Sequence, residues 1–200
     1  GFETTAPLAA ATVKSAAEKH ASNFFILPGC KTIPNALKAL LDSGELKLDG
    51  LICPGHVSAV IGSNPYEFMA RDYRVPCVIT GFEPLDVLQG LLMLLTQVMS
   101  GKAEVQTQYS RIVTAEGNRK AVETMYEVFE PCDSEWRGLG TIPGSGLRLS
   151  KKYARFDASR LLQSRPRRKP DGRGCACGEV LRGVKTPPEC RLFAKACTPD

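Results

Sequence analysis

Four of the eight cysteines lie close together near the carboxyl end of the chain, and thiols in such numbers can bind metals. Cys175 and Cys177 form a C-x-C pair, and Cys190 and Cys197 follow as single residues. Four thiolates brought together by a folded loop are the ligand set of a tetrahedral zinc site or of a cubane iron–sulfur cluster. The spacing matches neither paired C-x-x-C knuckles nor the bacterial ferredoxin run, so it predicts a metal without identifying it.

Two other interpretations of these cysteines stay open at this point. The thiols of the C-x-C pair are poorly placed to bridge each other, but each could form a disulfide with a more distant cysteine. Free thiols are the third possibility. Glycines and prolines between the cysteines favour tight turns, which a loop around a metal needs because its backbone must approach closely. We therefore expect a metal-organised loop and not a packed domain, with turn residues Gly174, Gly178, Gly183, Pro187 and Pro188.

Composition limits the kinds of partner. The chain has 200 residues, of which 43% are hydrophobic, which suits one large or two small globular domains. The net charge of +5 is mild, and much of it comes from a basic run at residues 164–174. We interpret this run as a solvated linker, the alternative being a docking strip for an acidic partner or nucleic acid. It contains no aromatic residue for base stacking, so we expect no nucleic-acid partner.

Neither a membrane span nor a secretory signal is recognisable in the sequence. The most apolar stretch, Leu85–Met99, is too short and too polar to cross a bilayer. The first residues, GFETT, do not have the charged and apolar regions of a signal peptide. Clustered cysteines in such a chain favour a reducing compartment, so we expect a cytoplasmic protein without a membrane partner.

Helical segments and short apolar runs alternate over the first half of the chain. This alternation predicts an α/β fold with an open, mostly parallel sheet and flanking helices, followed by a smaller iron–sulfur-binding segment. The strands are expected at residues 23–29, 48–55 and 76–81, and the helices at about 5–20, 34–41, 66–73 and 83–101.

The alternation stops after Gly101. A further helix is predicted at residues 117–132, and the glycine-rich stretch 136–149 is interpreted as close backbone packing, because it does not contain G-x-G-x-x-G. We place a domain boundary near residue 102. The chain would then consist of an α/β domain at 1–102 and a C-terminal domain at 103–200, which holds the cysteine loop at 164–200.

Three turns follow predicted strands or open predicted helices, and the carboxyl edge of a parallel sheet is where ligands bind. These turns are Gly1–Thr5, Cys53–His56 and Gly81–Pro84. His56, in a strand-end loop, could transfer protons, contact a ligand or orient a thiol, or it could simply cap a backbone carbonyl. Glu3 and Thr4 could bind a polar group together with helix N-terminal amides, although capping alone explains such residues.

The remaining four cysteines are weaker candidates. Cys53 lies three residues before His56 and could form a thiolate beside it. Strand-end cysteines are more often small buried hydrophobes, and we favour that role for Cys53, Cys77 and Cys132. The role of Cys30, in a more exposed turn, is left open.

Six motifs in order resemble the hydrogenase maturation factor HypD family. They are GFETTAP, CPGHVSAVIG, GFEPLDVLQ, QYSRIVTAEGN, GLGTIPGSGL and the closing C-x-C-G-x-V-L-x-G…P-x-x-C-x-L-F-x-x-x-C-T-P. The resemblance covers nearly all of the chain. It implies two similar α/β domains and a further domain that holds a [4Fe–4S] cluster, whose ligands would be Cys175, Cys177, Cys190 and Cys197.

The resemblance also implies a function. Proteins of this family form a scaffold with the small partner HypC, on which an iron carrying cyanide and carbon monoxide, Fe(CN)2CO, is assembled for [NiFe]-hydrogenases. HypE delivers the cyanide. Such a protein is a metallocentre assembly scaffold with a redox role and not a turnover enzyme. The turns bearing Glu3, Thr4, His56 and Glu83 would line a cleft that faces the second α/β domain.

The sequence departs from the family in two respects. The family's N-terminal portion, with its iron-binding cysteine and a C-P-x-C thiol pair, is not in this sequence, which therefore resembles the C-terminal half. Ala194 stands where the family usually has Gly. The alternatives to the scaffold are a zinc-stabilised protein-interaction module, which would dock a partner through its basic run, and a small α/β enzyme that uses His56.

Overall fold

The computed structural model describes residues 1–43, 45–162 and 174–197. Most of the basic run at 164–174 lies outside these residues. The helices are α1 (Ala6–Glu18), α2 (Ile33–Asp42), α3 (Gly55–Ile61), α4 (Glu67–Tyr73), α5 (Pro84–Ser100), α6 (Arg119–Val128) and α7 (Cys177–Leu181). The strands are β1 (Leu51–Pro54), β2 (Cys77–Thr80), β3 (Val105–Thr107), β4 (Phe129–Trp136) and β5 (Gly140–Leu149). Short 3₁₀ turns are η1 (Asn64–Tyr66), η2 (Lys151–Phe156), η3 (Ala158–Arg160) and η4 (Pro187–Glu189).

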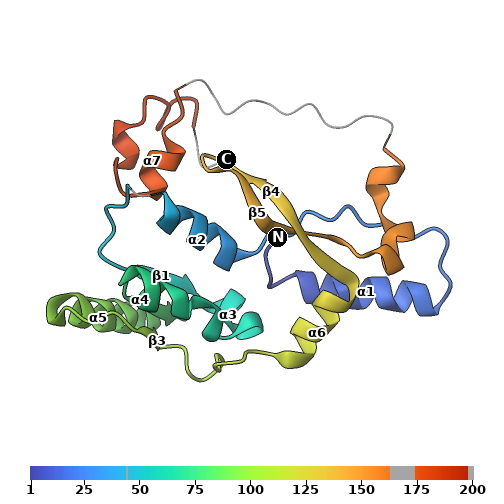
Figure 1. Cartoon of the computed structure of the whole chain (residues 1–200), viewed down its shortest axis with the longest axis horizontal. Helices are drawn as coiled ribbons and strands as arrows, with labels where there is room; N and C mark the ends of the chain where they lie inside the picture. The colour runs from blue at the N-terminus through green and yellow to red at the C-terminus, as the bar shows by residue number, and fades with distance from the viewer. Residues whose placement is uncertain (44, 163–173, 198–200) are drawn as a thin grey trace.

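A parallel sheet with flanking helices confirms the predicted α/β class. Strands β1, β2 and β3 lie side by side in that order, and both pairs are parallel. Helices α3 and α4 follow β1, and α5 connects β2 to β3, as parallel pairing requires. Every residue of β2 is buried, as expected for a strand covered on both faces. The sheet and its helices form the blue-green and green half of the molecule in Figure 1.

Two predicted elements are wrong. The helix predicted at 117–132 ends at Val128, and β4 begins at the next residue and pairs antiparallel with β5. Pro131 explains the change, because a proline inside a helix removes one hydrogen bond and clashes with the preceding turn. The strand predicted at 23–29 is only an isolated bridge between Ile26 and Asp157. Ile26 hydrogen-bonds with Phe156 and Ala158, so this segment lies alongside the η2 and η3 turns and does not join the sheet.

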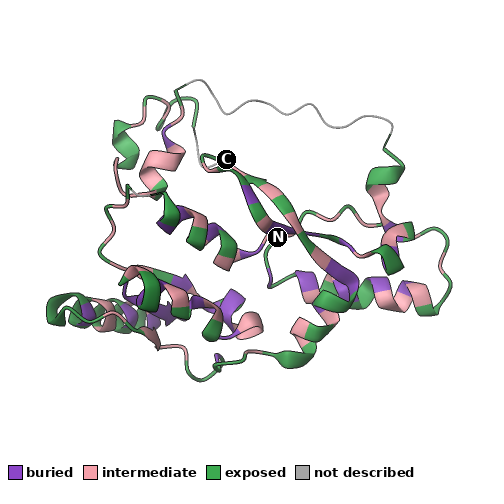
Figure 2. Cartoon of the chain, viewed as in Figure 1, coloured by how far each residue is buried: buried purple, intermediate pink, exposed green. Residues whose placement is uncertain are grey.

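The buried residues form two clusters that do not follow chain order. In one, α1 packs against α6, the β4–β5 hairpin and η2, through residues that include Val13, Met125 and Phe156. The other contains the parallel sheet with α2 and α4, and its buried residues lie between Leu41 and Val113. The first helix therefore shares a core with elements that come after residue 119 (Figures 1 and 2). The boundary near residue 102 stays a prediction, and β3, just beyond it, belongs to the same sheet as β1 and β2.

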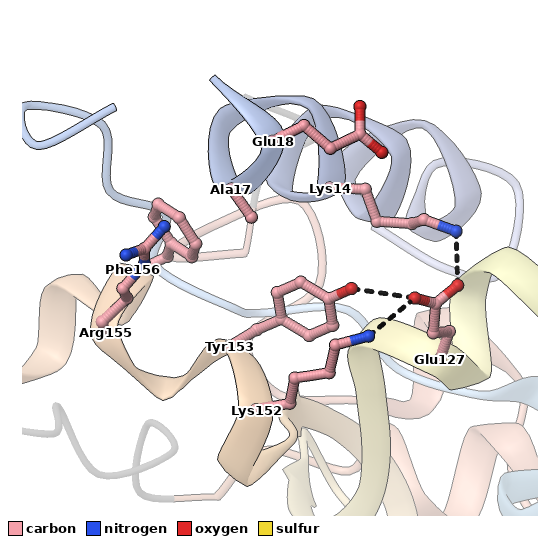
Figure 3. Close-up of a pocket in the computed structure, with 8 residues that line it drawn as sticks. All are labelled: Lys14, Ala17, Glu18, Glu127, Lys152, Tyr153, Arg155 and Phe156. Atoms are coloured by element: carbon pink, nitrogen blue, oxygen red, sulfur yellow. Dashed lines mark hydrogen bonds and ion pairs between the residues drawn. The ribbon is translucent and has the colours of Figure 1, made fainter. Parts of the chain in front are cut away.

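Glu127, at the end of α6, links the elements of the first cluster. Its carboxylate forms ion pairs with Lys14 of α1 and with Lys152 of η2, the latter at 3.1 Å. The Tyr153 hydroxyl donates a hydrogen bond to the same carboxylate at 2.9 Å. Figure 3 shows the three side chains converging on Glu127. These hydrogen bonds, with Lys14 contributing most, lower the pKa of Glu127 from 4.5 to about 2.

We expect Glu127→Gln to lower the melting temperature at neutral pH and to have little effect at pH 2. A carboxyl group with a lowered pKa in the folded state stabilises the fold above its unfolded pKa, and this contribution disappears as pH falls towards the folded value. The difference from wild type should therefore shrink between about pH 4.5 and pH 2. Thermal unfolding followed by circular dichroism measures it, with Glu123→Gln on an exposed position of α6 as control. A difference that is constant with pH would contradict the prediction.

Candidate functional site

The cysteine segment, residues 174–197, is held between two other parts of the chain. On one side, the Lys47 N–H donates a 2.9 Å hydrogen bond to the Arg182 carbonyl, and the Arg182 guanidinium pairs with Glu45 at 3.4 Å. On the other side, the β4–β5 turn lies directly against the start of α7. A Cβ on Gly178 would come within 2.2 Å of the Gly138 carbonyl oxygen. The segment is therefore docked on the α2–β1 connection and the hairpin turn.

Three of the four candidate ligand cysteines come together within this segment. Cys177, Cys190 and Cys197 line one pocket of about 320 Å³. Cys175 is not among the residues that line this pocket, but its thiol lies beside that of Cys177. The remaining walls of the pocket are largely apolar and consist of Arg137, Val180, Leu181, Pro187 and Phe193.

The surroundings of two thiols differ in a way that bears on metal binding. Interactions with backbone N–H groups lower the pKa of the Cys190 thiol, with Ala176 contributing most and Leu192 next. A thiol whose thiolate is already hydrogen-bonded is prepared to act as a ligand. The hydrogen bond with Cys175 raises the pKa of Cys177, and the charge of Arg137 opposes this rise. The pair would therefore be easier to ionise when a cation or cluster shares the charge.

An iron–sulfur cluster at this position would take its ligands from Cys175, Cys177, Cys190 and Cys197. Among the residues that the structure describes, no three His, Cys, Asp or Glu side chains lie in an arrangement that could hold a metal ion. The donor set nevertheless suits a cluster, because three of the cysteines line one largely apolar pocket, Cys175 lies beside Cys177, and backbone N–H groups lower the pKa of Cys190. Hydrogen bonds to sulfur and an apolar surrounding are features that tune such clusters.

Two of the three candidate turns meet at one edge of the parallel sheet. His56 was expected in a loop after β1, but it lies in the first turn of α3, which begins at Gly55 directly after the strand. Its ring packs on Phe82 of the β2–α5 turn, with centroids 4.1 Å apart. Both side chains are exposed. Gly55 allows the start of α3 to lie close to the end of β2, because a Cβ on Gly55 would lie 2.2 Å from the Thr80 carbonyl oxygen. Glu83 follows Phe82 and is also exposed.

Glu3 lies in a different place from His56. Its side chain is only 1% exposed, and Oε1 accepts a 2.7 Å hydrogen bond from the N–H of Ile33, the first residue of α2. Oε2 is buried without a hydrogen-bond partner among the described residues, and burial raises the pKa of Glu3. Glu3 also contributes to a cavity of about 390 Å³ that neither His56 nor Glu83 lines. Its neighbour Thr4 is exposed.

The other cysteines are placed largely as packing residues. Cys53 and Cys77, on neighbouring strands, are at most 1% exposed, which agrees with their predicted role as small hydrophobes. A hydrogen bond between the two thiols is the main cause that raises the pKa of Cys53. Cys132 on β4 is half-buried, and Cys30 lies 3.9 Å from the Thr5 hydroxyl.

Comparison with known proteins decides the family. The family model described as the hydrogenase formation hypA family, HypD, matches residues 1–200. The chain belongs to the HypD family. It is 47% identical over 207 residues to a hydrogenase maturation factor HypD of Cupriavidus necator, covering 100% of this chain and 55% of the relative. A HypD of Rhizobium leguminosarum bv. viciae is 46% identical over 207 residues, and a hydrogenase expression/formation protein HupD of Azotobacter chroococcum is 46% identical over 206. All of this chain matches each of these two, which it covers to 54% of their length.

The chain therefore spans about half the length of the curated relatives that it matches. Within the part of this HypD-family chain that the structure describes, no helix combines the length and apolar character that crossing a bilayer requires.

Two family motifs hold each other in place through Asp86. In GFEPLDVLQ, the Asp86 carboxylate accepts hydrogen bonds of 2.8 and 2.6 Å from both terminal nitrogens of Arg111, which belongs to QYSRIVTAEGN. Gln108 donates to Asp86 at 2.9 Å and accepts from the Gly81 N–H at 3.2 Å. The contacts with Arg111 lower the pKa of Asp86 most and bring it to about 2. This network fixes the turn that carries Phe82 against His56.

Asp86→Ala is expected to loosen that turn and to weaken the contact between His56 and Phe82. Gln108 and Arg111 would keep their donors without the carboxylate that now accepts from both. The proton NMR signals of His56 should move towards the values of a free imidazole, because the neighbouring Phe82 ring shifts them in the wild type. His20 is the other histidine and serves as an internal reference. Asp72→Ala, which removes an exposed pair with Arg71 on α4, should leave the His56 signals unchanged.

Sequence reasoning missed two parts of this arrangement. It did not pair Asp86 with Gln108 and Arg111, although an acid on one motif and a base on the next could have suggested a pair. It also missed Arg137, which enters the cysteine pocket from the hairpin turn. No local pattern connects this arginine with cysteines that come some forty residues later.

Proposed function

We propose that this chain is part of a hydrogenase maturation scaffold, on which the Fe(CN)2CO group of [NiFe]-hydrogenases is assembled with HypC- and HypE-type partners. We further propose that Cys175, Cys177, Cys190 and Cys197 hold a [4Fe–4S] cluster. Membership of the HypD family supports the scaffold, and the matched relatives bear hydrogenase maturation or formation names. The observation that supports the cluster is that three of these cysteines line one pocket and that Cys175 lies beside Cys177.

In this proposal the residues of the chain have a positioning role, and they do not turn over a substrate. The cluster, when bound, supplies one electron at a time. Its thiol ligands stay reduced in the cytoplasm, which we propose as the compartment. Glu3, Thr4, His56 and Glu83 remain the proposed cleft residues. The shared edge of His56 and Glu83 gives those two a common surface, whereas Glu3 would act from its own cavity.

Two measurements test the proposal separately. For the cluster, the chain is purified without oxygen and analysed for iron, sulfide and zinc. About four irons per chain and a broad absorption band at about 400 nm would support the cluster. One zinc in a colourless protein would instead indicate a structural zinc module.

For the scaffold, the complete protein that contains this chain is expressed in a hydrogenase-producing host that does not have its own HypD. Restored hydrogen uptake would support the maturation role, and His56→Ala should reduce that uptake if His56 belongs to the cleft. Failure of the wild-type protein to restore uptake, with stable expression in a host that a known HypD does complement, would contradict the role.

A further inference from the structure

Arg137 is a cationic residue that the β4–β5 turn brings to the cysteine pocket from outside the cysteine segment. It lines the pocket together with Cys177, Cys190 and Cys197, whose walls are otherwise largely apolar. Building on the cluster proposed above, we propose that Arg137 sets the reduction potential of this site: its guanidinium favours the reduced, more negative state of the bound cluster.

The backbone around Arg137 is held on the side of the cysteine segment. A Cβ on Gly138, the next residue, would lie 2.6 Å from the Gly178 nitrogen and 3.0 Å from the Cys177 Cβ. Since Gly138 has a φ of +76°, the turn also has a backbone conformation that most residues avoid. The residue after Arg137 thus touches the residue beside a proposed ligand.

Trp136, the residue before Arg137, is also held in place. The Trp136 indole N–H donates a 2.8 Å hydrogen bond to the Ser145 hydroxyl, and the ring stacks on Phe2 with centroids 6.0 Å apart. The Lys31 ammonium lies 4.8 Å from the centre of the same ring. Both chain neighbours of Arg137 are therefore held in place, and Arg137 itself lines the cysteine pocket.

Two other cations of the cysteine segment are Arg182 and Lys185. Arg182 pairs with Glu45 at 3.4 Å, and Lys185 pairs with Glu179 at 2.7 Å. Neither residue is among those that line the pocket in the described part of the chain. Arg137 differs from them in position, since it lines the pocket together with three of the cysteines.

The chemical effect follows from charge. One-electron reduction converts [4Fe–4S]2+ to [4Fe–4S]+, so the four-thiolate site gains one negative charge. A nearby cation stabilises the more negative state by more than it stabilises the less negative one. Arg137 is exposed, so water and salt screen part of this effect. We expect a shift of about three- to tenfold in the ratio of reduced to oxidised cluster at a given potential.

The test is an anaerobic redox titration of the cluster-loaded chain, followed by the electron paramagnetic resonance signal of the reduced cluster. Arg137→Gln and Arg137→Met remove the charge, and the methionine keeps an apolar stem that can still pack in the pocket. Both should lower the fraction reduced by three- to tenfold, where tenfold equals 59 mV for a one-electron couple. Arg137→Lys keeps the charge and should stay close to wild type.

The matched control is Arg148→Gln. Arg148 lies on β5 of the same hairpin and pairs with Glu130 at 2.8 Å, so its loss changes the net charge equally without changing the pocket. Its titration should equal that of the wild type. The dependence on salt concentration is a second readout, because added salt should narrow the difference in reduced fraction between Arg137→Gln and wild type.

The outcomes separate this inference from the cluster itself. If the wild type contains no iron and sulfide, both are overturned. If all variants hold the cluster with the same potential, or if Arg137→Lys behaves like the neutral variants, the role of the Arg137 charge is overturned while the cluster stands. If Arg137→Gln does not load, Arg137→Met and Arg137→Lys still provide the comparison of neutral and charged side chains.

Discussion

Replacing Cys190 by Ser is expected to remove most of the iron from the protein while leaving its fold intact. Backbone N–H groups, chiefly those of Ala176 and Leu192, lower the pKa of the Cys190 thiol, and the Phe193 N–H donates a 3.0 Å hydrogen bond to the Cys190 carbonyl. A serine oxygen can interact with the same N–H groups, so the local structure should persist. Iron in clusters nevertheless depends on thiolate ligands, and an alcohol is a far weaker one. Iron should fall from about four per chain to less than one.

The measurement combines iron and sulfide analysis with circular dichroism on the anaerobically purified chain. Cys132→Ser is the control, because Cys132 is half-buried on β4 and does not line the cysteine pocket. It should keep both metal and fold. If Cys190→Ser keeps full iron and sulfide, the assignment of Cys190 as a ligand is wrong. If it loses its helical signal as well, the loss of iron reflects unfolding, and Cys197→Ser becomes the informative variant.

What the sequence predicts well in this chain is local. The strands at β1 and β2 and the helix α5 were expected because apolar runs, turn residues and a helical apolar pattern lie within each element. The same holds for the cysteines, whose spacing placed four thiols within one short segment. The structure adds that three of these cysteines line one pocket, which spacing alone cannot decide because disulfides fit the same pattern.

What the sequence predicts badly depends on contacts between distant residues. The apolar pattern of α6 continues through Phe129, and only pairing with β5 makes Phe129–Trp136 a strand. Residues 23–29 have the composition of a strand, yet their hydrogen bonds are with Phe156 and Ala158. Glu3 illustrates the same limit within the candidate site. Glu3 was expected beside the N-terminus of the helix that follows it directly. Its carboxylate instead caps the N-terminus of α2, some thirty residues later.

The contact between Gly138 and Gly178 yields the second large expected effect. Gly178 lies inside α7, and replacing glycine by alanine in a helix normally stabilises it by roughly 0.5–1 kcal/mol. Here the new Cβ would lie 2.2 Å from the Gly138 carbonyl oxygen, a distance at which backbone must move. Gly178→Ala should therefore push the hairpin turn away from the cysteine segment. Since Gly178 adjoins Cys177, we expect iron to fall to less than half of the wild-type content.

Gly140→Ala distinguishes this steric effect from ordinary glycine effects. Gly140 belongs to the same hairpin and has a φ of +73°, but nothing lies within 4 Å of the Cβ that alanine would add. The variant should lose about 1 kcal/mol of stability through backbone strain and keep its iron. Iron analysis and thermal unfolding of both variants thus give opposite patterns. Gly178→Ala loses metal because docking is blocked, whereas Gly140→Ala loses stability because its backbone is strained. Full iron in Gly178→Ala would mean that the cysteine site assembles without the hairpin turn, and Arg137 would then have no fixed place beside it.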